Sequence, residues 1–133
     1  MKFSLFQFVI AIAGVWVVVQ PVPGEESPAE RPKQFIYVLR LVPRLYDDKN
    51  WTKEDTAVLG RHFARFQEAI KSRQLILAGR TKEQGDKTFG IAIFEAPDEA
   101  AARAFMQADP AVSGGLMTAE LHPFAVALER RNP

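Results

Sequence analysis

Residues 74–95, QLILAGRTKEQGDKTFGIAIFE, decide which fold the sequence predicts. Two strand-like runs, 74–82 and 88–95, are separated by Gln84-Gly85-Asp86-Lys87, a sequence typical of a hairpin turn. The second run is rich in Phe and Ile, which are common in strands. We therefore expect an antiparallel pair of strands near the middle of the chain. The segments before and after this pair indicate which helices and strands pack against it.

A helix is expected before the hairpin. Thr52 resembles a helix N-cap, because Asp55 follows three residues later in a weaker form of the capping box. Apolar residues then recur at helical spacing, as Leu59, Phe63, Phe66 and Ile70. His62 lies beside this stripe on a helical wheel, so we expect it at the border between core and solvent.

A second helix is expected after the hairpin. Pro97 lies near its first turn, and Asp98 and Glu99 place acids at the positive end of the helix dipole. The inner face of this helix would carry Ala101, Ala102, Phe105 and Met106. Asp109-Pro110 would end the helix, and residues 113–115, Ser-Gly-Gly, are typical of a turn.

Two outer strands complete the pattern. Residues 35–41 alternate between two faces, and residues 118–128 form the last strand. The order β-α-β-β-α-β predicts an α+β, ferredoxin-like protein: a four-stranded antiparallel sheet with two helices on one face. The other face would still carry apolar side chains from residues 35–41 and 88–95. An open apolar sheet face predicts a homodimer that packs sheet to sheet.

The first residues resemble a targeting segment. Lys2 is followed by an apolar run over residues 3–19 and by a polar, helix-breaking end. This pattern predicts a secretory signal over residues 1–24, with export to the periplasm or the extracellular space after cleavage before Glu25. A membrane anchor that is not cleaved is the alternative, although residues 3–19 are short for a bilayer core of about 30 Å.

One folded domain is expected after this segment. Residues 25–34 are rich in Pro and Glu and predict a flexible lead-in, and residues 35–129 form the domain. Hydrophobic residues make up 47% of the chain and charged residues 25%, which is typical of a globular protein.

The composition excludes several kinds of site. The chain has no cysteine, which excludes disulfides, thiolate nucleophiles and Cys-ligated zinc, and its two histidines are too few for a multi-His metal site. A net charge of +1 without a Lys/Arg-rich block gives no electrostatic reason to bind nucleic acid. No cofactor motif is present, so we expect neither a cofactor nor a metal. Proton transfer, elimination or isomerisation is then favoured over redox chemistry.

His62 and Asp109 are the candidate catalytic residues. A histidine at the border of a helix can act as an acid or a base near neutral pH. The two predicted helices lie side by side on one sheet face, so a carboxylate at the end of the second helix could reach His62 and orient its ring. The alternatives are a structural histidine and an aspartate that only starts a turn before Pro110.

Four further residues are candidate contacts to a small-molecule ligand. Arg80, at the end of the second strand, could hold an anionic group, because a guanidinium matches a carboxylate with two hydrogen bonds. Tyr46 and Trp51 flank the loop before the first helix and could line a pocket, and His122 lies on the last strand. Each has a structural alternative: a solvated arginine, aromatic residues that fill the core, and a structural strand histidine.

Several short motifs, in this order, resemble the YCII-related (YciI-like) family. In that family a helix histidine is followed by an aliphatic strand ending in Ala-Gly, as in residues 62–70 (HFARFQEAI) and 74–79 (QLILAG). Glu99-Ala100 opens the second helix, residues 109–115 fit Asp-Pro-x-x-x-x-Gly, and residues 122–124 fit a closing x-Pro-Phe. The resemblance extends over residues 34–129.

The resemblance implies a ferredoxin-like dimer related to the dimeric α/β barrels, with an active site on His62 and Asp109. Most members of the family have no known reaction, and some relatives are dehydrochlorinases linked to the breakdown of chlorinated aromatics. Arg80 departs from the family, where many members carry Pro after Ala-Gly. The export signal is a second departure, since many members resemble cytoplasmic proteins.

Three kinds of function are open for these residues, and the third, after the two described next, is a purely structural role. The first is an exported enzyme that uses a His/Asp acid–base pair on a small molecule, in an elimination, isomerisation or hydrolysis. The second is a non-catalytic module that binds a small ligand or a partner. In the enzyme the pair should face a cavity, whereas a structural His62 should bond a backbone carbonyl and face no pocket.

Overall fold

The order of elements in the computed structural model, which describes residues 32–130, agrees with the predicted order. The strands are β1 (Lys33–Leu41), β2 (Leu75–Arg80), β3 (Gly90–Ala96) and β4 (Met117–Phe124). The α-helices are α1 (Lys53–Lys71), α2 (Glu99–Gln107) and α3 (Pro110–Ser113), and short 3-10 helices lie at Pro43–Leu45, Asp48–Asn50 and Gly85–Lys87. The predicted signal and most of the predicted lead-in lie outside the described residues.

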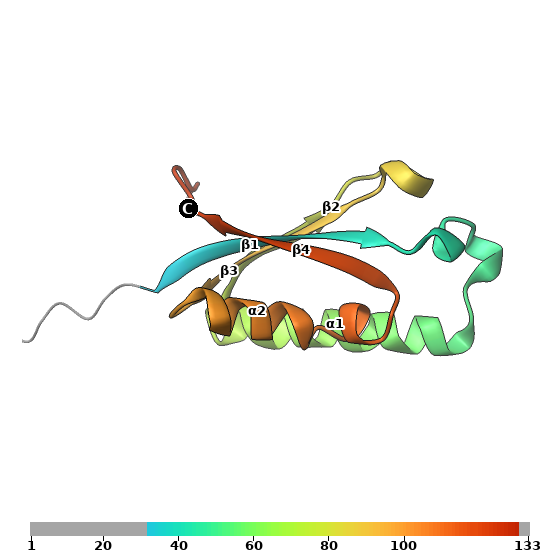
Figure 1. Cartoon of the computed structure of the whole chain (residues 1–133), viewed down its shortest axis with the longest axis horizontal. Coiled ribbons are helices and arrows are strands. Elements are labelled where there is room, and N and C mark those ends of the chain that lie inside the picture. The colour runs from blue at the N-terminus through green and yellow to red at the C-terminus, as the bar shows by residue number, and fades with distance from the viewer. Residues whose placement is uncertain (1–31, 131–133) are drawn as a thin grey trace, which may run out of the picture. The chain divides into compact units, whose positions relative to one another are not determined.

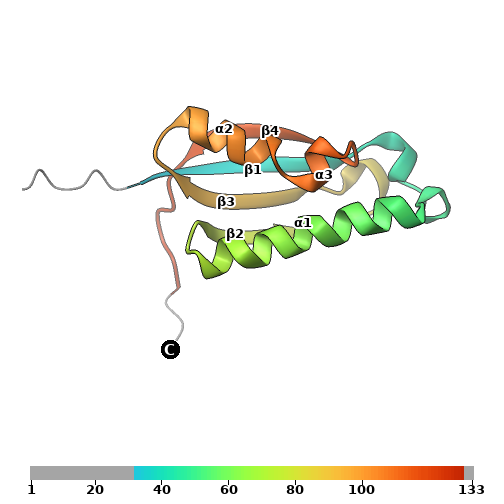
Figure 2. The same ribbon diagram turned by 90° about the horizontal axis from the view of Figure 1, so that it is seen from below.

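The four strands form one antiparallel sheet in the order β2-β3-β1-β4. Figure 1 shows α1 and α2 on one side of this sheet, and Figure 2 shows α1 along its β2 side, with α2 and α3 towards β1 and β4. The predicted α+β, ferredoxin-like class is therefore confirmed.

Two details at the C-terminal end differ from the prediction. The chain between α2 and β4 contains the helix α3, which the sequence does not predict because four residues are too few to show a helical period. The turn predicted at residues 113–115 follows this helix, at Gly114 and Gly115. Strand β4 ends at Phe124 instead of residue 128, because Phe124 pairs with Gln34 near the start of β1. Beyond this point the Val126 amide donates to the Gln34 Oε1 atom, at 2.7 Å.

The core lies between the sheet and the helices. Strand β1 contributes Phe35, Tyr37 and Leu39, and β3 contributes Ala92 and Phe94, all of them buried. These residues alternate along their strands with residues of the opposite face, as the period-two pattern of residues 35–41 predicted. The helices close this layer with Phe66, Ala69, Ala102 and Met106.

Helix α1 is rotated relative to our expectation. Its buried face consists of Asp55, Val58, His62, Phe66 and Ala69. His62 is only 4% exposed, so its predicted position at the border with solvent is wrong. Two residues of the predicted core stripe, Phe63 and Ile70, are instead 54% and 50% exposed. The apolar spacing identified the helix, but two adjacent faces of this helix are apolar, and the stripe alone did not indicate which of them faces the core.

Close packing between α1 and the end of α3 depends on Gly114. A Cβ atom at this position would lie 2.6 Å from the Pro110 carbonyl oxygen and 2.9 Å from the Val58 Cγ1 atom. Both distances are shorter than a carbon atom tolerates, and the first involves backbone that cannot rotate away. A residue without a side chain is therefore needed where α3 meets α1.

We predict that Gly114→Ala lowers the free energy of unfolding by about 1–3 kcal/mol, because the added methyl group overpacks this contact. Gly60→Ala is the matched control: it adds the same methyl group on α1, where no atom lies within 4 Å. The control should leave stability unchanged or raise it by about 1 kcal/mol, since Ala is the better helix former. Urea denaturation measures both, and equal effects of the two substitutions would contradict the packing argument.

The sheet face opposite the helices carries an apolar centre. Ile36 and Val38 of β1 lie opposite Ile93 and Ile91 of β3, and Leu77 of β2, which is 48% exposed, lies beside Ile93. These five residues point away from the helices, because they alternate with the buried residues of the same strands.

We propose, as the sequence predicted, that this face packs against the same face of a second copy. Such an interface should bury at least about 1,200 Å² in total. Light scattering should then give the mass of two chains, and replacing Val38 with Lys should shift the protein towards the mass of one chain. The mass of a single chain for the unmodified protein would exclude the dimer.

Candidate active site

A pocket of about 560 Å³ lies between α1 and the strands β1, β2 and β3. Its wall from α1 includes the apolar face that does not enter the core, with Leu59, Phe63 and Ile70. On the sheet side, Ala78 of β2 and Gly90 of β3 are small residues at positions where a larger side chain would fill the space. The remaining lining residues are Leu39, Leu41, Trp51, His62, Phe66, Gln67, Leu75, Gly79, Arg80, Thr88, Ile91 and Met117.

His62 lies between the core and this pocket. Its Nδ1 atom is 2.7 Å from the Asp109 Oδ1 atom, and its ring packs on Phe66 with 4.3 Å between the ring centroids. The Nε2 atom has no hydrogen-bond partner among residues 32–130, and His62 is one of the lining residues of the pocket. The imidazole therefore uses one nitrogen for a buried contact and keeps the other for the pocket.

Asp109 is fully buried and receives three hydrogen bonds. As the N-cap of α3, it accepts from the Ala111 amide at 2.9 Å through the same Oδ1 atom that contacts His62. Its Oδ2 atom accepts from the Tyr37 hydroxyl at 2.8 Å. Burial alone would raise the pKa of Asp109, but the contacts with His62, Ala111 and Tyr37 together hold that pKa below its ordinary value.

Tyr37 remains a hydrogen-bond donor in this arrangement. Burial and the neighbouring Asp109 charge raise the pKa of the Tyr37 hydroxyl far above its ordinary value, so the hydroxyl stays protonated. The alternation of residues 35–41 puts Tyr37 on one strand face with Phe35 and Leu39, and it indicates no role for Tyr37 in the site. Nothing in the local pattern marks it, because its partner Asp109 lies 72 residues further along the chain.

The protonation state of neutral His62 follows from these contacts. An ionised carboxylate only accepts hydrogen bonds, so the 2.7 Å contact requires the proton of neutral His62 to be on Nδ1. The Nε2 atom then carries a lone pair towards the pocket, and the Asp109 contact holds the ring in this orientation. This is the geometry of a general base whose orientation is fixed by a carboxylate.

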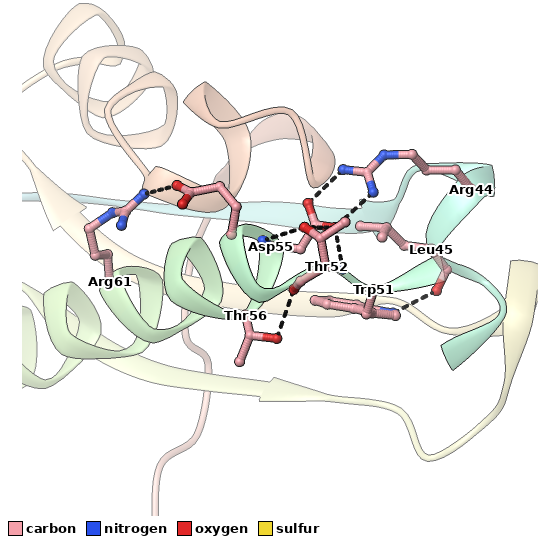
Figure 3. Close-up of polar contacts among 8 residues, drawn as sticks. Arg44, Leu45, Trp51, Thr52, Asp55, Thr56 and Arg61 are labelled. Atoms are coloured by element: carbon pink, nitrogen blue, oxygen red, sulfur yellow. Dashed lines mark hydrogen bonds and ion pairs between the residues drawn. The ribbon is translucent and has the colours of Figure 1, made fainter. Parts of the chain in front are cut away.

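The loop before α1 is held by an ion pair at the start of the helix (Figure 3). Both guanidinium Nη atoms of Arg44 contact the Asp55 carboxylate, at 2.7 and 2.9 Å. Asp55 also forms the predicted capping box with Thr52, and its hydrogen bonds with Arg44 lower its pKa. The Trp51 indole donates to the Leu45 carbonyl at 3.1 Å, which fixes this aromatic side chain where it lines the pocket.

The four predicted ligand contacts divide into two groups. Arg80 and Trp51 line the same pocket as His62. Tyr46 and His122 do not, so the structure does not bring them to this site. Tyr46 follows the first 3-10 helix and is 40% exposed. His122 pairs with Ile36 on the open face of the sheet, on the opposite side from α1, and its Nε2 atom lies 3.6 Å from Glu120.

Residues 32–130 contain neither a cluster of metal ligands nor a membrane-spanning helix. In this range no group of three or more His, Asp and Glu side chains is placed to hold a metal ion. Within the same residues, no helix has both the length and the apolar character needed to cross a membrane.

We predict that Asp109→Asn lowers the free energy of unfolding by about 2–3 kcal/mol near pH 7, because it weakens buried hydrogen bonds to a charged group. The pKa of Asp109 is lowered in the folded protein, so its carboxylate stabilises the fold above about pH 4, and this contribution is lost as the pH falls further. The difference between the two proteins should therefore shrink below about pH 4.

Urea denaturation at a series of pH values measures this difference. The carboxylate of Asp55, whose pKa is also lowered, is present in both proteins, so its effect cancels. A difference that stays constant across the whole range would show that the Asp109 charge does not contribute.

Comparison with known families agrees with this architecture. The YCII-related domain matches residues 40–125, a segment that runs from the end of β1 through β4 and includes both His62 and Asp109. No curated protein matches the chain in sequence. Because the match covers more than half of the sequence, the protein belongs to the YCII-related domain family.

Proposed function

We propose that the protein is an enzyme that moves a proton on a small molecule bound in the pocket, without a cofactor. His62 is the general base or acid and acts through Nε2. Asp109 is a positioning residue that holds the ring through Nδ1, and Tyr37 fixes the carboxylate. The observation that carries this proposal is the 2.7 Å contact between His62 and a fully buried Asp109, on a histidine that lines a pocket of about 560 Å³.

The type of reaction follows from the kind of groups in the pocket. Its lining is mostly aliphatic and aromatic, and among residues 32–130 it contains no cysteine, serine or carboxylate that could serve as a nucleophile. The one hydroxyl in this part of the lining, that of Thr88, donates to the Glu83 carbonyl. The imidazole is therefore the group best placed to take or give a proton. Abstraction of a proton next to an activating group, followed by elimination or isomerisation, needs one such base. A hydrolysis would need the same base to activate a water molecule.

The second candidate is a module that binds a small ligand in the same pocket without converting it. One observation favours it: a pocket with apolar walls and few polar groups is suited to binding alone. In that case the contact between His62 and Asp109 would serve mainly to satisfy a buried carboxylate. The two candidates differ in whether the bound molecule changes.

We predict that wild-type protein converts its ligand or exchanges one of the ligand's hydrogens for deuterium in D2O, whereas His62→Gln does so at least about 100-fold more slowly. Small molecules that co-purify with the protein are first identified by mass spectrometry and then returned to both proteins. His62→Gln should still bind them, since Gln keeps a polar side chain of similar length. Binding without any exchange or conversion by the wild type would favour the binding module.

Export and cleavage before Glu25 also remain proposals, because they concern residues outside the described range. If both apply, the enzyme would act in the periplasm or outside the cell, on a molecule that reaches it there. N-terminal sequencing of the processed protein tests this assignment, and a chain that keeps Lys2 in a membrane fraction would favour the anchor.

A further inference from the structure

We propose that the ligand of this pocket is a small organic carboxylate with a ring-sized apolar body, held by Arg80 at its charged end. This inference rests on the proposed function for the location of the site and adds the class of molecule that enters it. Three properties of the pocket support it: the positive charge of its lining, the lack of a partner for the Arg80 side chain, and the space that Gly90 leaves beside the sheet.

The pocket lining has one permanently charged side chain. Among the residues around it, Arg80 is a cation and none is an aspartate or a glutamate. His62 adds positive charge when it is protonated, and Asp109 lies behind the imidazole, outside the lining. Arg80 is exposed and belongs to the pocket lining, so its guanidinium can meet an anionic group that enters the pocket from solvent.

The Arg80 side chain makes no hydrogen bond or ion pair with any other residue in the range 32–130. The position of Arg80 in the sheet explains why its side chain lines the pocket. Arg80 is the last residue of β2 and pairs with Gly90, on the sheet face that also carries Ala78 and Ala92. Its side chain therefore starts on the same face as α1, and its guanidinium keeps its donors for a ligand. Two parallel hydrogen bonds to a carboxylate match that group best.

The room for the ligand's body comes from the small residue opposite Arg80. A Cβ atom at Gly90 would lie 3.6 Å from the Leu39 Cβ atom and 3.4 Å from the Gly79 carbonyl oxygen, both ordinary contacts. Gly90 also has no positive φ angle, so its backbone does not require glycine. An alanine there is compatible with the strand, and a larger side chain would extend into the pocket. Glycine at this position therefore keeps the pocket open.

The walls of the pocket favour a flat apolar body. Trp51, Phe63 and Phe66 contribute aromatic side chains, and Trp51 is fixed by its hydrogen bond to Leu45. A ring between these walls, with a carboxylate at Arg80, would have its other end available to His62. Binding would thus position one part of the molecule for proton transfer by anchoring another part.

The test compares carboxylic acids with their neutral amides as probes: benzoate, phenylacetate and cyclohexanecarboxylate against the corresponding amides. Binding to the full chain is followed by NMR titration. We expect at least one acid to bind about tenfold more tightly than its amide. Arg80→Gln should remove this preference and leave the binding of the amide unchanged, whereas Arg80→Lys should keep part of it.

Gly90→Val should weaken acid and amide alike by about tenfold or more, because it fills the space that both occupy. Gly60→Ala, outside the pocket, should change neither, and Gly90→Ala gives an intermediate case if the valine variant does not fold. The proposal is overturned if no acid binds better than its amide, or if Arg80→Gln leaves the preference intact.

The test of carboxylate binding can succeed or fail independently of the test of catalysis. His62→Gln should bind the carboxylates within about threefold of the wild type, because the charged end is held by Arg80. Preference for carboxylates in a protein that never converts its ligand would support this inference and exclude the enzyme. Turnover that depends on His62, without any preference for the anion, would support the enzyme and overturn this inference.

Discussion

The buried carboxylate of Asp109 is the constraint on which the rest of the arrangement depends. A charge with no exposure to solvent is costly unless hydrogen bonds replace its hydration. Asp109 receives these bonds from three elements: His62 on α1, Tyr37 on β1 and the first turn of α3. If any one element moved, a buried charge would lose a donor. The carboxylate therefore fixes the relative positions of the sheet, α1 and α3.

The same requirement explains the local sequence around it. Pro110 can begin α3 directly after Asp109 because the first helical position needs no amide hydrogen, and the aspartate side chain caps the amide of Ala111. Gly114 then lets the end of α3 approach Val58 on α1, four residues before His62. A capping residue, a proline and a glycine within six positions thus bring a carboxylate on one helix to a histidine on another.

The sequence predicts the architecture well because turn residues and periodicity are local signals. The hairpin at residues 84–87, the capping box of Thr52 and Asp55, and the alternation of residues 35–41 each involve neighbouring residues. The convergence of His62 and Asp109 was also predictable, because the fold places both helices on one sheet face and the family resemblance singles out both residues. The rotation of α1 was not, because its core face and its pocket face are both apolar.

The residues that sequence reasoning missed act through long-range contacts. Tyr37 has the pattern of an ordinary core residue, and only the fold brings its hydroxyl to a carboxylate. Arg44 lies in a loop, and its pairing with Asp55 depends on how the 3-10 helices turn the chain back to α1. Tyr46 and His122 lie outside the pocket lining, and the local pattern does not indicate this. Tyr46 follows a 3-10 helix in a loop, and the face of His122 depends on the register of β4. The alternation of β4 places His122 on the face away from α1.

The residues around His62 have different roles on the two sides of its ring: those near Nδ1 stabilise the fold, and those near Nε2 line the pocket. On the Nδ1 side, the network continues from Asp109 through Tyr37 towards Arg65. The Arg65 guanidinium donates to the Phe105 carbonyl at 2.8 Å and lies 4.1 Å from the centroid of the Phe105 ring. Burial and Asp109 raise the pKa of Tyr37, and the Arg65 charge opposes them only in part. This cation therefore acts on the Tyr37 hydroxyl, whereas His62, Ala111 and Tyr37 stabilise the Asp109 carboxylate.

On the Nε2 side, some lining residues such as Leu39 and Phe66 belong to the core, but Arg80 and Gly90 do not. The Arg80 side chain has no partner among the described residues, and Gly90 meets only ordinary contacts at its missing Cβ atom. Changes on the Nδ1 side must therefore alter stability together with any activity, whereas changes on the Nε2 side can alter ligand choice and leave the core intact. Substitutions of Arg80 or Gly90 are therefore expected to change which molecule the protein binds, whereas substitutions of Asp109 or Tyr37 are expected to change its stability.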